Sequence, residues 1–90
     1  MSRRGNFFTD KEKEVFLKDM GIAIRTIRKI RGLTLLQLHE LSGVSITLLS
    51  ELEKGKRNPS IITLLNLTCA LNVFCSDFFP GVERFHAKRK

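Results

Sequence analysis

The chain has 90 residues, of which 42% are hydrophobic, so we expect one folded domain with a single modest core and not a wholly disordered chain. No apolar run approaches the roughly 18 residues needed to span a bilayer, and none follows the basic N-terminus, so we expect a cytoplasmic protein without a membrane segment or signal peptide. The formal net charge of +7 favours a polyanionic partner, either a nucleic acid or an anionic membrane surface.

The first predicted helix follows a basic arm, residues 1–8, that we expect to be flexible. Thr9 and Glu12 fit a capping box, in which both side chains satisfy free backbone N–H groups at a helix start. The helix then continues to about Arg31, where Gly32 can accept the left-handed backbone of a C-terminal cap. Its packing face repeats at intervals of three and four residues: Phe16, Met20, Ile24 and Ile27.

Two short helices are predicted next. The first begins at Thr34, where Gln37 completes a capping box, and ends at Ser42 and Gly43; the second is capped by Ser45 and ends at Gly55. The core-facing residues predicted on the two helices are Leu38, Leu41, Leu49 and Leu52. Gly43 supplies the positive φ that a tight turn needs, and Val44 enters the core behind it. Helices joined in this way stand at a steep angle, so the second can lie in a DNA major groove while the first crosses the backbone.

The last part of the chain is predicted to hold two more helices. Ser60 caps the first of them, whose packing face is predicted to be Ile61, Leu64, Leu65, Thr68 and Leu71. A short helix from Ser76 to Phe79 stops at Pro80 and Gly81, and residues 81–90 form a loose tail. The sequence therefore predicts an all-α domain of five helices over residues 9–80, with a helix-turn-helix at residues 34–54.

Many positions between residues 19 and 79 follow the order of one family. They are Gly21, Ile24, Arg25, Ile27, Arg28, Arg31, Gly32, Leu33 and Thr34, then Leu38, Leu41, Ser42, Gly43, Val44, Ser45, Leu49, Ser50, Leu52, Glu53, Gly55, Lys56, Arg57, Asn58, Pro59 and Ser60, and finally Thr63, Leu64, Leu67, Ala70, Leu71, Val73 and Phe79. Together they resemble the Xre/Cro family, the phage-repressor type of helix-turn-helix protein. Each motif alone is weak, but so many positions in the correct order are specific.

The resemblance implies roles for individual residues. An arginine at the Arg28 position pairs with a glutamate at the Glu53 position and links the first helix to the recognition helix; the alternative is two independent surface charges. Base edges are read from the start and middle of the third helix, here Ser45, Ile46, Thr47, Ser50 and Glu51. Phosphates are held at the start of the second helix and in the loop after the third, here by Thr34, Leu35, Lys54, Lys56, Arg57 and Asn58.

Several positions depart from the family's pattern. Leu35 replaces a glutamine that reaches the phosphates, and His39 replaces a small alanine, so the histidine must be exposed or partly buried. Ile46 and Leu48 are apolar among the base-reading positions, where isoleucine can touch a thymine methyl but cannot hydrogen-bond a base. Glu51 can accept from a cytosine amine, yet it repels phosphates. Ile22, Ile30 and Leu36 are further apolar departures. Together the apolar departures either form a patch that meets another protein or reflect ordinary drift, with some of them packed inside.

The C-terminal region is rich in aromatic side chains, and the family often dimerises there. Because so small a bundle cannot easily bury so many rings, the expected dimer interface consists of Phe78, Phe79, Val82 and Phe85. Two copies would then place their recognition helices about 34 Å apart on a near-palindrome. Phe74 replaces a family capping serine, so either Ser76 caps the last helix or Phe74 is buried. At the other end, Arg3 and Arg4 either enter a minor groove or belong to a disordered terminus.

No motif in the sequence indicates catalysis. Cys69 and Cys75 lack the spacing and the histidines of a zinc site, and we expect both to be reduced. The sequence has no nucleophile–base constellation and no glycine-rich phosphate loop, and 90 residues leave little room for a pocket. We therefore expect no enzyme activity, no cofactor and no metal.

The distribution of charge leaves two functions open. The net charge is +5 over residues 1–31, zero over residues 32–58 and +2 over residues 59–90. The basic first helix and the basic loop at residues 56–58 favour a homodimeric, sequence-specific transcriptional regulator, such as a repressor, on near-palindromic double-stranded DNA. The neutral recognition segment, with Ile46 and Leu48, favours the alternative, a protein-interaction module or antitoxin-type partner with weak DNA binding.

Overall fold

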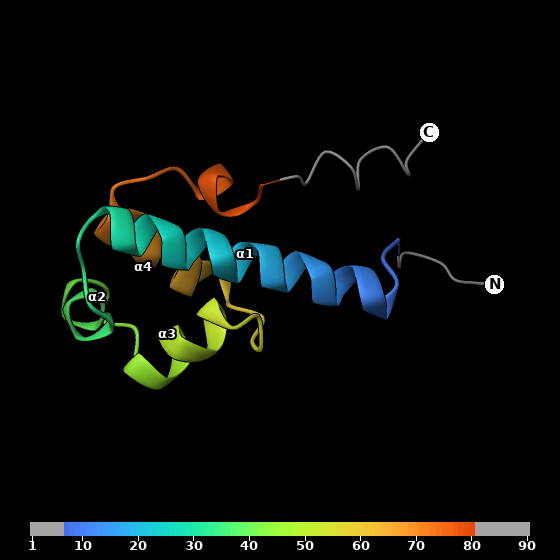
Figure 1. Cartoon of the computed structure of the whole chain (residues 1–90), viewed down its shortest axis with the longest axis horizontal. Coiled ribbons are helices and arrows are strands. Elements are labelled where there is room, and N and C mark those ends of the chain that lie inside the picture. Colours follow the sequence, from blue (N-terminus) through green and yellow to red (C-terminus); the bar gives the residue numbers. More distant parts are fainter. Residues whose placement is uncertain (1–6, 81–90) are drawn as a thin grey trace.

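In the computed structural model of the protein, residues 7–80 are described, and they form four α-helices and one short 3₁₀-helix (Figure 1). The helices are α1 (Asp10–Ile30), α2 (Leu35–Ser42), α3 (Ile46–Glu53), α4 (Ile61–Leu71) and the 3₁₀-helix η1 (Cys75–Phe78). The all-α prediction is confirmed for this part of the chain, but the prediction of five α-helices is wrong. Most of the predicted arm, with Arg3 and Arg4, and the predicted tail at 81–90 lie outside the described residues.

Each α-helix begins at a hydroxyl side chain that the sequence predicted as its cap. In α1 the Thr9 hydroxyl accepts from the Glu12 N–H at 3.1 Å, and the Glu12 carboxylate accepts from the Thr9 N–H at 2.9 Å. Thr34 forms the same reciprocal pair of bonds with Gln37 at the start of α2, whereas Ser45 and Ser60 cap α3 and α4 by accepting one backbone N–H each. These caps satisfy N–H groups that have no partner inside a helix, so they fix where each helix starts.

The helix η1 takes the place of the predicted fifth α-helix. The N–H of Phe74, the residue before its first turn, donates to the Asp77 carboxylate at 2.9 Å, and the Phe74 ring is 79% exposed. Both expected arrangements, a Ser76 cap and a buried Phe74, are therefore wrong. The helix stops after four residues because Pro80 disfavours helical backbone at Phe79, whose φ is −120° and ψ is 56°.

The core lies where all five helices meet, and its central side chains are at most 6% exposed. They are Met20 and Ile24 from α1, Leu38 from α2, Val44 from the turn, Leu49 and Leu52 from α3, Leu67 and Leu71 from α4, and Phe78 from η1. α1 packs against α3 and η1, which Figure 1 shows on opposite sides of it, and α2 packs against α3 and α4. The long helix α1 is therefore the element on which α3 is placed.

Three predicted core residues are exposed instead. Leu41, Ile61 and Leu65 are 60%, 72% and 48% exposed, whereas Leu67, which was not predicted, is fully buried. Most residues of α4 are apolar, so the three- and four-residue spacing fits more than one face and the sequence cannot choose between them. In α2 the buried side runs through Leu38, and Leu41 lies beyond its edge.

Arg31 connects the end of α1 to the end of α4. Its Nε donates to the Leu71 carbonyl at 2.8 Å and its Nη2 to the Asn72 carbonyl at 3.2 Å. The last carbonyls of a helix lack partners within the helix and carry partial negative charge, so a guanidinium satisfies them well. This contact was not predicted, because the two residues are far apart in sequence.

Candidate nucleic-acid interface

The turn between α2 and α3 has the geometry of a helix-turn-helix. Gly43 caps α2 with φ of 76° and ψ of 0°, and its N–H donates to the His39 carbonyl at 2.8 Å. Glycine alone adopts this left-handed backbone without strain from a Cβ, so the predicted turn position is confirmed. Val44 follows at 6% exposure, and its N–H donates to the Ser42 hydroxyl at 3.1 Å.

His39 links the two sides of this turn. Its ring Nδ1 lies 2.8 Å from the Val44 carbonyl oxygen. Because a carbonyl oxygen can only accept, Nδ1 must carry the proton and donate. The ring is half-buried, which is one of the two arrangements expected for it. The side chain thus sets the distance between α2 and the start of α3 by a hydrogen bond.

Arg28 of α1 and Glu53 of α3 form a nearly buried ion pair. Arg28 Nε donates to Glu53 Oε2 at 2.6 Å and Nη2 to Oε1 at 3.0 Å, while Nη1 donates to the Leu33 carbonyl at 2.8 Å. The two side chains are 10% and 7% exposed, so they are not independent surface charges. The hydrogen bond with Glu53 raises the pKa of Arg28 above its ordinary value, against the opposing effect of burial. The pair fixes the orientation of α3 on α1.

Gly21 allows the backbones of α1 and α3 to come close together. It is buried, and a Cβ at this position would lie 2.7 Å from the Glu53 carbonyl oxygen and 2.9 Å from the Glu53 carbonyl carbon. Backbone atoms cannot rotate away from such a contact, so only glycine fits without moving α3. Gly21 and the ion pair therefore hold α3 against α1 at neighbouring points.

The five base-facing residues predicted around α3 differ in how exposed their side chains are and in whether their polar groups are free to bond a base. Ile46 is 41% exposed, and Thr47 is also exposed. Ser45 is exposed, but its hydroxyl already accepts from a backbone N–H of α3 at 3.1 Å. Ser50 and Glu51 are half-buried. The accessible part of this surface is therefore short and largely formed by one apolar and one hydroxyl side chain.

The predicted phosphate-binding residues fall into two groups. At the start of α2, the Thr34 hydroxyl and N–H are both engaged by Gln37, at 3.1 and 2.9 Å. Leu35 is half-buried and packs against the core, as does Leu48 of α3. The other four residues are exposed and follow one another closely at the end of α3 and in the loop after it: Lys54, Lys56, Arg57 and Asn58. The structure thus brings basic side chains next to α3, while the side chains of Thr34 and Leu35 at the start of α2 have little capacity to bind a phosphate.

Arg57 folds back from this loop onto α3. Its Nη1 donates to Glu51 Oε1 at 2.7 Å, and the two side chains are 54% and 38% exposed. The sequence predicted the two residues as separate DNA contacts, one to a phosphate and one to a base, and did not predict the pair. The available signal was a pair of opposite charges six residues apart across the helix end at Gly55.

Two of the four residues predicted to form the dimer interface, Phe78 and Phe79, lie within the described residues. Phe78 is fully buried within its own chain, so its ring does not contribute to an interface, and that prediction is wrong. Phe79 is half-buried, and its ring packs on Phe16 with 5.5 Å between the centroids. Val82 and Phe85 lie outside the described residues.

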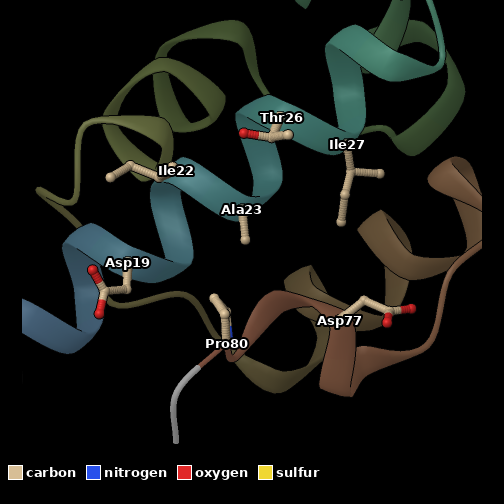
Figure 2. Close-up of a pocket in the computed structure, with 7 residues that line it drawn as sticks. All are labelled: Asp19, Ile22, Ala23, Thr26, Ile27, Asp77 and Pro80. Atoms are coloured by element: carbon tan, nitrogen blue, oxygen red, sulfur yellow. The ribbon is translucent and has the colours of Figure 1, made fainter.

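A shallow groove of about 500 Å³ lies between α1 and η1 (Figure 2). It is lined by Asp19, Ile22, Ala23, Thr26, Ile27, Asp77 and Pro80. Ala23 and Ile27 point from α1 toward the η1 side, and the carboxylates of Asp19 and Asp77 lie at opposite ends (Figure 2). Since η1 and α3 lie on opposite sides of α1, the groove is remote from α3 (Figure 1).

Three of the apolar residues that depart from the family's pattern, on α1 and α2, are on the surface. Ile22, Ile30 and Leu36 are 62%, 73% and 53% exposed, so these three are not packed inside, whereas Leu48 packs against the core. Ile22 and Ile30 are eight residues apart on α1, a spacing that places them on the same face of the helix.

Within residues 7–80 the structure can be checked for a metal site and for a membrane-spanning helix. In this range no three His, Cys, Asp or Glu side chains gather in a way that could hold a metal ion, and Cys69 and Cys75 are free thiols. None of the helices in this range is long and apolar enough to cross a membrane.

A short helix pair with a left-handed glycine turn, held by a buried ion pair to a long first helix, defines a helix-turn-helix domain of the repressor type. The helix-turn-helix family HTH_3 matches residues 24–73, more than half of the chain. The chain therefore belongs to this family of Xre/Cro-type helix-turn-helix proteins, as its sequence predicted.

Two similar proteins are transcriptional regulators by name, and a similar solved structure is that of a controller protein. The chain is 37% identical over 60 residues to the HTH-type transcriptional regulator DdrOP3 of Deinococcus deserti; the match covers 67% of this chain and 46% of that protein, so the chain spans about half its length. It is 43% identical over 56 residues to the uncharacterised HTH-type transcriptional regulator y4dJ of Sinorhizobium fredii, covering 62% and 73% of the two. The crystal structure of the restriction-modification controller protein C.AhdI from Aeromonas hydrophila has a TM-score of 0.68 and 32% identity, covering 70% of this chain and 96% of that one.

Proposed function

We propose that this protein is a cytoplasmic, sequence-specific transcriptional regulator that binds double-stranded DNA as a homodimer on a near-palindromic operator. The observation that carries the proposal is the placement of α3, which Arg28 and Glu53 hold beside an exposed basic loop. A helix presented in this way can enter the major groove while the loop neutralises phosphates. Relatives named as transcriptional regulators support the same function.

On this proposal, phosphate contacts supply most of the affinity. Lys54, Lys56 and Asn58 are exposed beside α3, whereas few side chains of α3 can hydrogen-bond a base. Ile46 can touch a thymine methyl, and Thr47 can bond a base edge. We therefore expect binding that depends steeply on salt, with a sequence preference set by a small number of positions.

The homodimer is proposed at the C-terminal end of the chain. Phe79, Val82 and Phe85 are the candidate interface residues, since Phe78 belongs to the core. A two-fold dimer would place two copies of α3 about 34 Å apart, one DNA turn. The similarity to a restriction-modification controller protein over almost all of that protein supports a regulator built on this domain. If sedimentation shows that the protein is a monomer and that it also binds DNA as a single copy, the proposed homodimer is wrong.

Competition measured by fluorescence anisotropy tests the DNA-binding function. We expect a duplex from the region upstream of the protein's own gene to compete better than a random-sequence duplex of the same length. Affinity for both should fall steeply between about 50 and about 200 mM salt. Lys56→Ala should weaken both complexes to the same degree, because a phosphate contact carries no sequence information. If the upstream duplex competes no better than random DNA, the regulator function is wrong.

A second candidate function is protein binding through the apolar face of α1. Exposed Ile22 and Ile30 share that face, and Ile22 also lines the groove beside η1. A partner bound there, as in an antitoxin-type complex, would leave α3 free, because the groove is on the other side of α1. Two results together would favour this function over the first: the protein shows no sequence preference for DNA, and the substitution Ile22→Lys abolishes binding of a protein partner.

A further inference from the structure

The ion pair between Glu51 and Arg57 joins two side chains that are each expected to contact DNA. It is made across the end of α3, where the N–H groups of Gly55 and Lys56 donate to the carbonyls of Leu52 and Glu51 at 3.0 and 2.9 Å. These backbone bonds turn the chain back along the helix, so Arg57 Nη1 reaches Glu51 Oε1 at 2.7 Å. The geometry of the pair therefore follows from the loop itself.

This pair lowers the free positive charge beside α3. Residues 45–58 contain two glutamates, and both are neutralised within the protein: Glu53 by Arg28, and Glu51 by Arg57. Two lysines then remain as the free cations of this segment. An arginine that already has a carboxylate partner releases no DNA counterion unless the pair opens and the guanidinium reaches a phosphate.

Opening the pair has a consequence for Glu51 as well. A carboxylate released beside DNA lies close to phosphates, which repel it, unless it finds a hydrogen-bond donor. Two bases present donors in the major groove, cytosine and adenine, and the usual partner of a carboxylate is the amino group of cytosine. The half-buried Glu51 is on α3, the helix that we expect to enter the major groove. Its carboxylate can therefore meet a cytosine amine at some DNA sequences.

We propose that Glu51 is a specificity-determining residue that keeps Arg57 away from phosphates on most DNA sequences. This inference rests on the proposed DNA-binding function. At the preferred site Glu51 accepts from a cytosine amine, and Arg57 moves to a phosphate. At other sites the carboxylate has no new partner, so the ion pair stays closed and one phosphate contact is not made. The pair thereby lowers affinity for random DNA, whereas at the preferred site the new contacts of Glu51 and Arg57 offset the cost of opening it.

The strength of the pair suits this exchange. Both side chains are partly exposed, at 54% and 38%, and an exposed ion pair alters an equilibrium by a factor of about 1.5 to 5. A pair of that strength can open when both partners find new contacts, and its loss is large enough to measure.

Salt titrations of four proteins test the proposal: wild type, Glu51→Gln, Arg57→Gln and the double variant. The probes are a random-sequence duplex and the duplex that the wild type selects from a random library. Glu51→Gln should bind random DNA about two- to fivefold more tightly, with a salt slope steeper by about 0.9, because Arg57 becomes free to reach a phosphate. On the selected duplex its slope should equal that of the wild type.

Controls separate the pair from the simple loss of a negative charge. Glu40→Gln changes the charge equally at an exposed position of α2, so the effect of Glu51→Gln must exceed it. In the Arg57→Gln background, Glu51→Gln should have no effect beyond that of Glu40→Gln. Selection with Glu51→Gln should replace a cytosine preference at one position by adenine, which glutamine reads.

The results that would contradict the role of Glu51 differ from those that would contradict DNA binding itself. A gain no larger than that of Glu40→Gln, a gain that persists without Arg57, or an unchanged base preference would each refute the role of Glu51. If the wild type binds duplexes with a sequence preference while Glu51→Gln fails these tests, only this inference is lost. If the wild type has no duplex affinity at all, the proposed function is lost with it.

Discussion

Two polar contacts set the direction of α3, and neither depends on a bound ligand. One is the ion pair of Arg28 and Glu53, and the other is the hydrogen bond from His39 to the Val44 carbonyl. The resemblance to the family was sufficient to predict the first, because both charges stand at positions of its motif. The second could not be predicted, because a ring nitrogen bonded to a backbone carbonyl leaves no pattern in a sequence.

Replacing Arg28 by alanine would leave Glu53 without its partner at a position that is 7% exposed. We expect the free energy of unfolding to fall by about 3 kcal/mol or more, because an unpaired buried charge is costly. Arg28→Lys should recover only part of this, since an ammonium cannot reproduce the two parallel hydrogen bonds. Urea unfolding followed by circular dichroism measures both. Lys29→Ala, at an exposed neighbouring position, is the control, and an Arg28→Ala loss as small as that of the control would contradict the role of the pair.

Replacing His39 by alanine removes the hydrogen bond across the turn. The expected loss in the free energy of unfolding is about 1 kcal/mol, accompanied by weaker duplex binding, because α3 loses a positioning contact. His39→Asn places an amide N–H near the position of Nδ1 and should recover most of both losses. His39→Gln carries its amide farther out and should not. Equal behaviour of the asparagine and glutamine variants in thermal unfolding and anisotropy would show that this bond does not matter.

At the scale of the elements, the ends of helices were predictable and the buried face of α4 was not. Capping residues act through bonds to backbone only a few residues away, so Thr9, Thr34, Ser45 and Ser60 marked helix starts in the sequence itself. The face of α4 depends on which neighbour covers it, and a helix that is mostly apolar carries little local signal for that. The same limit applies to the interface, where the Glu51–Arg57 pair depends on how the loop turns.

The close approach of α1 and α3 leads to a prediction for Gly21. Glycine to alanine in a helix normally gains about 1 kcal/mol from helix propensity. Here the added Cβ would meet backbone atoms of Glu53 at 2.7 and 2.9 Å, and overpacking of this kind costs about 1–3 kcal/mol. We therefore expect Gly21→Ala to lower the melting temperature and to weaken DNA binding by displacing α3. Thr26→Ala, at an exposed position of the same helix, is the control, and a Gly21→Ala protein that is more stable than wild type would contradict the packing.

At the scale of the whole molecule, α1 separates two different surfaces. On one side lie α3 and the basic loop at residues 54–58, and on the other lies η1 (Figure 1). The groove beside η1 is lined by Ile22 and Pro80, among other residues. The first surface suits a polyanion, and the second has an apolar floor with a carboxylate at each end (Figure 2). The sequence predicted the first from the helix-turn-helix pattern and net charge, whereas the groove depends on how η1 returns to α1.

The most direct test of the central claim is an NMR titration of the isotope-labelled protein with the duplex from upstream of its gene. If α3 and its loop are the DNA-binding surface, the amides whose shifts change should cluster at residues 45–58 and at the start of α2. The amides that line the groove between α1 and η1 should remain unchanged. Shifts that cluster at the groove, or that spread evenly along the basic helix α1 without involving α3, would contradict the claim that this helix docks on DNA.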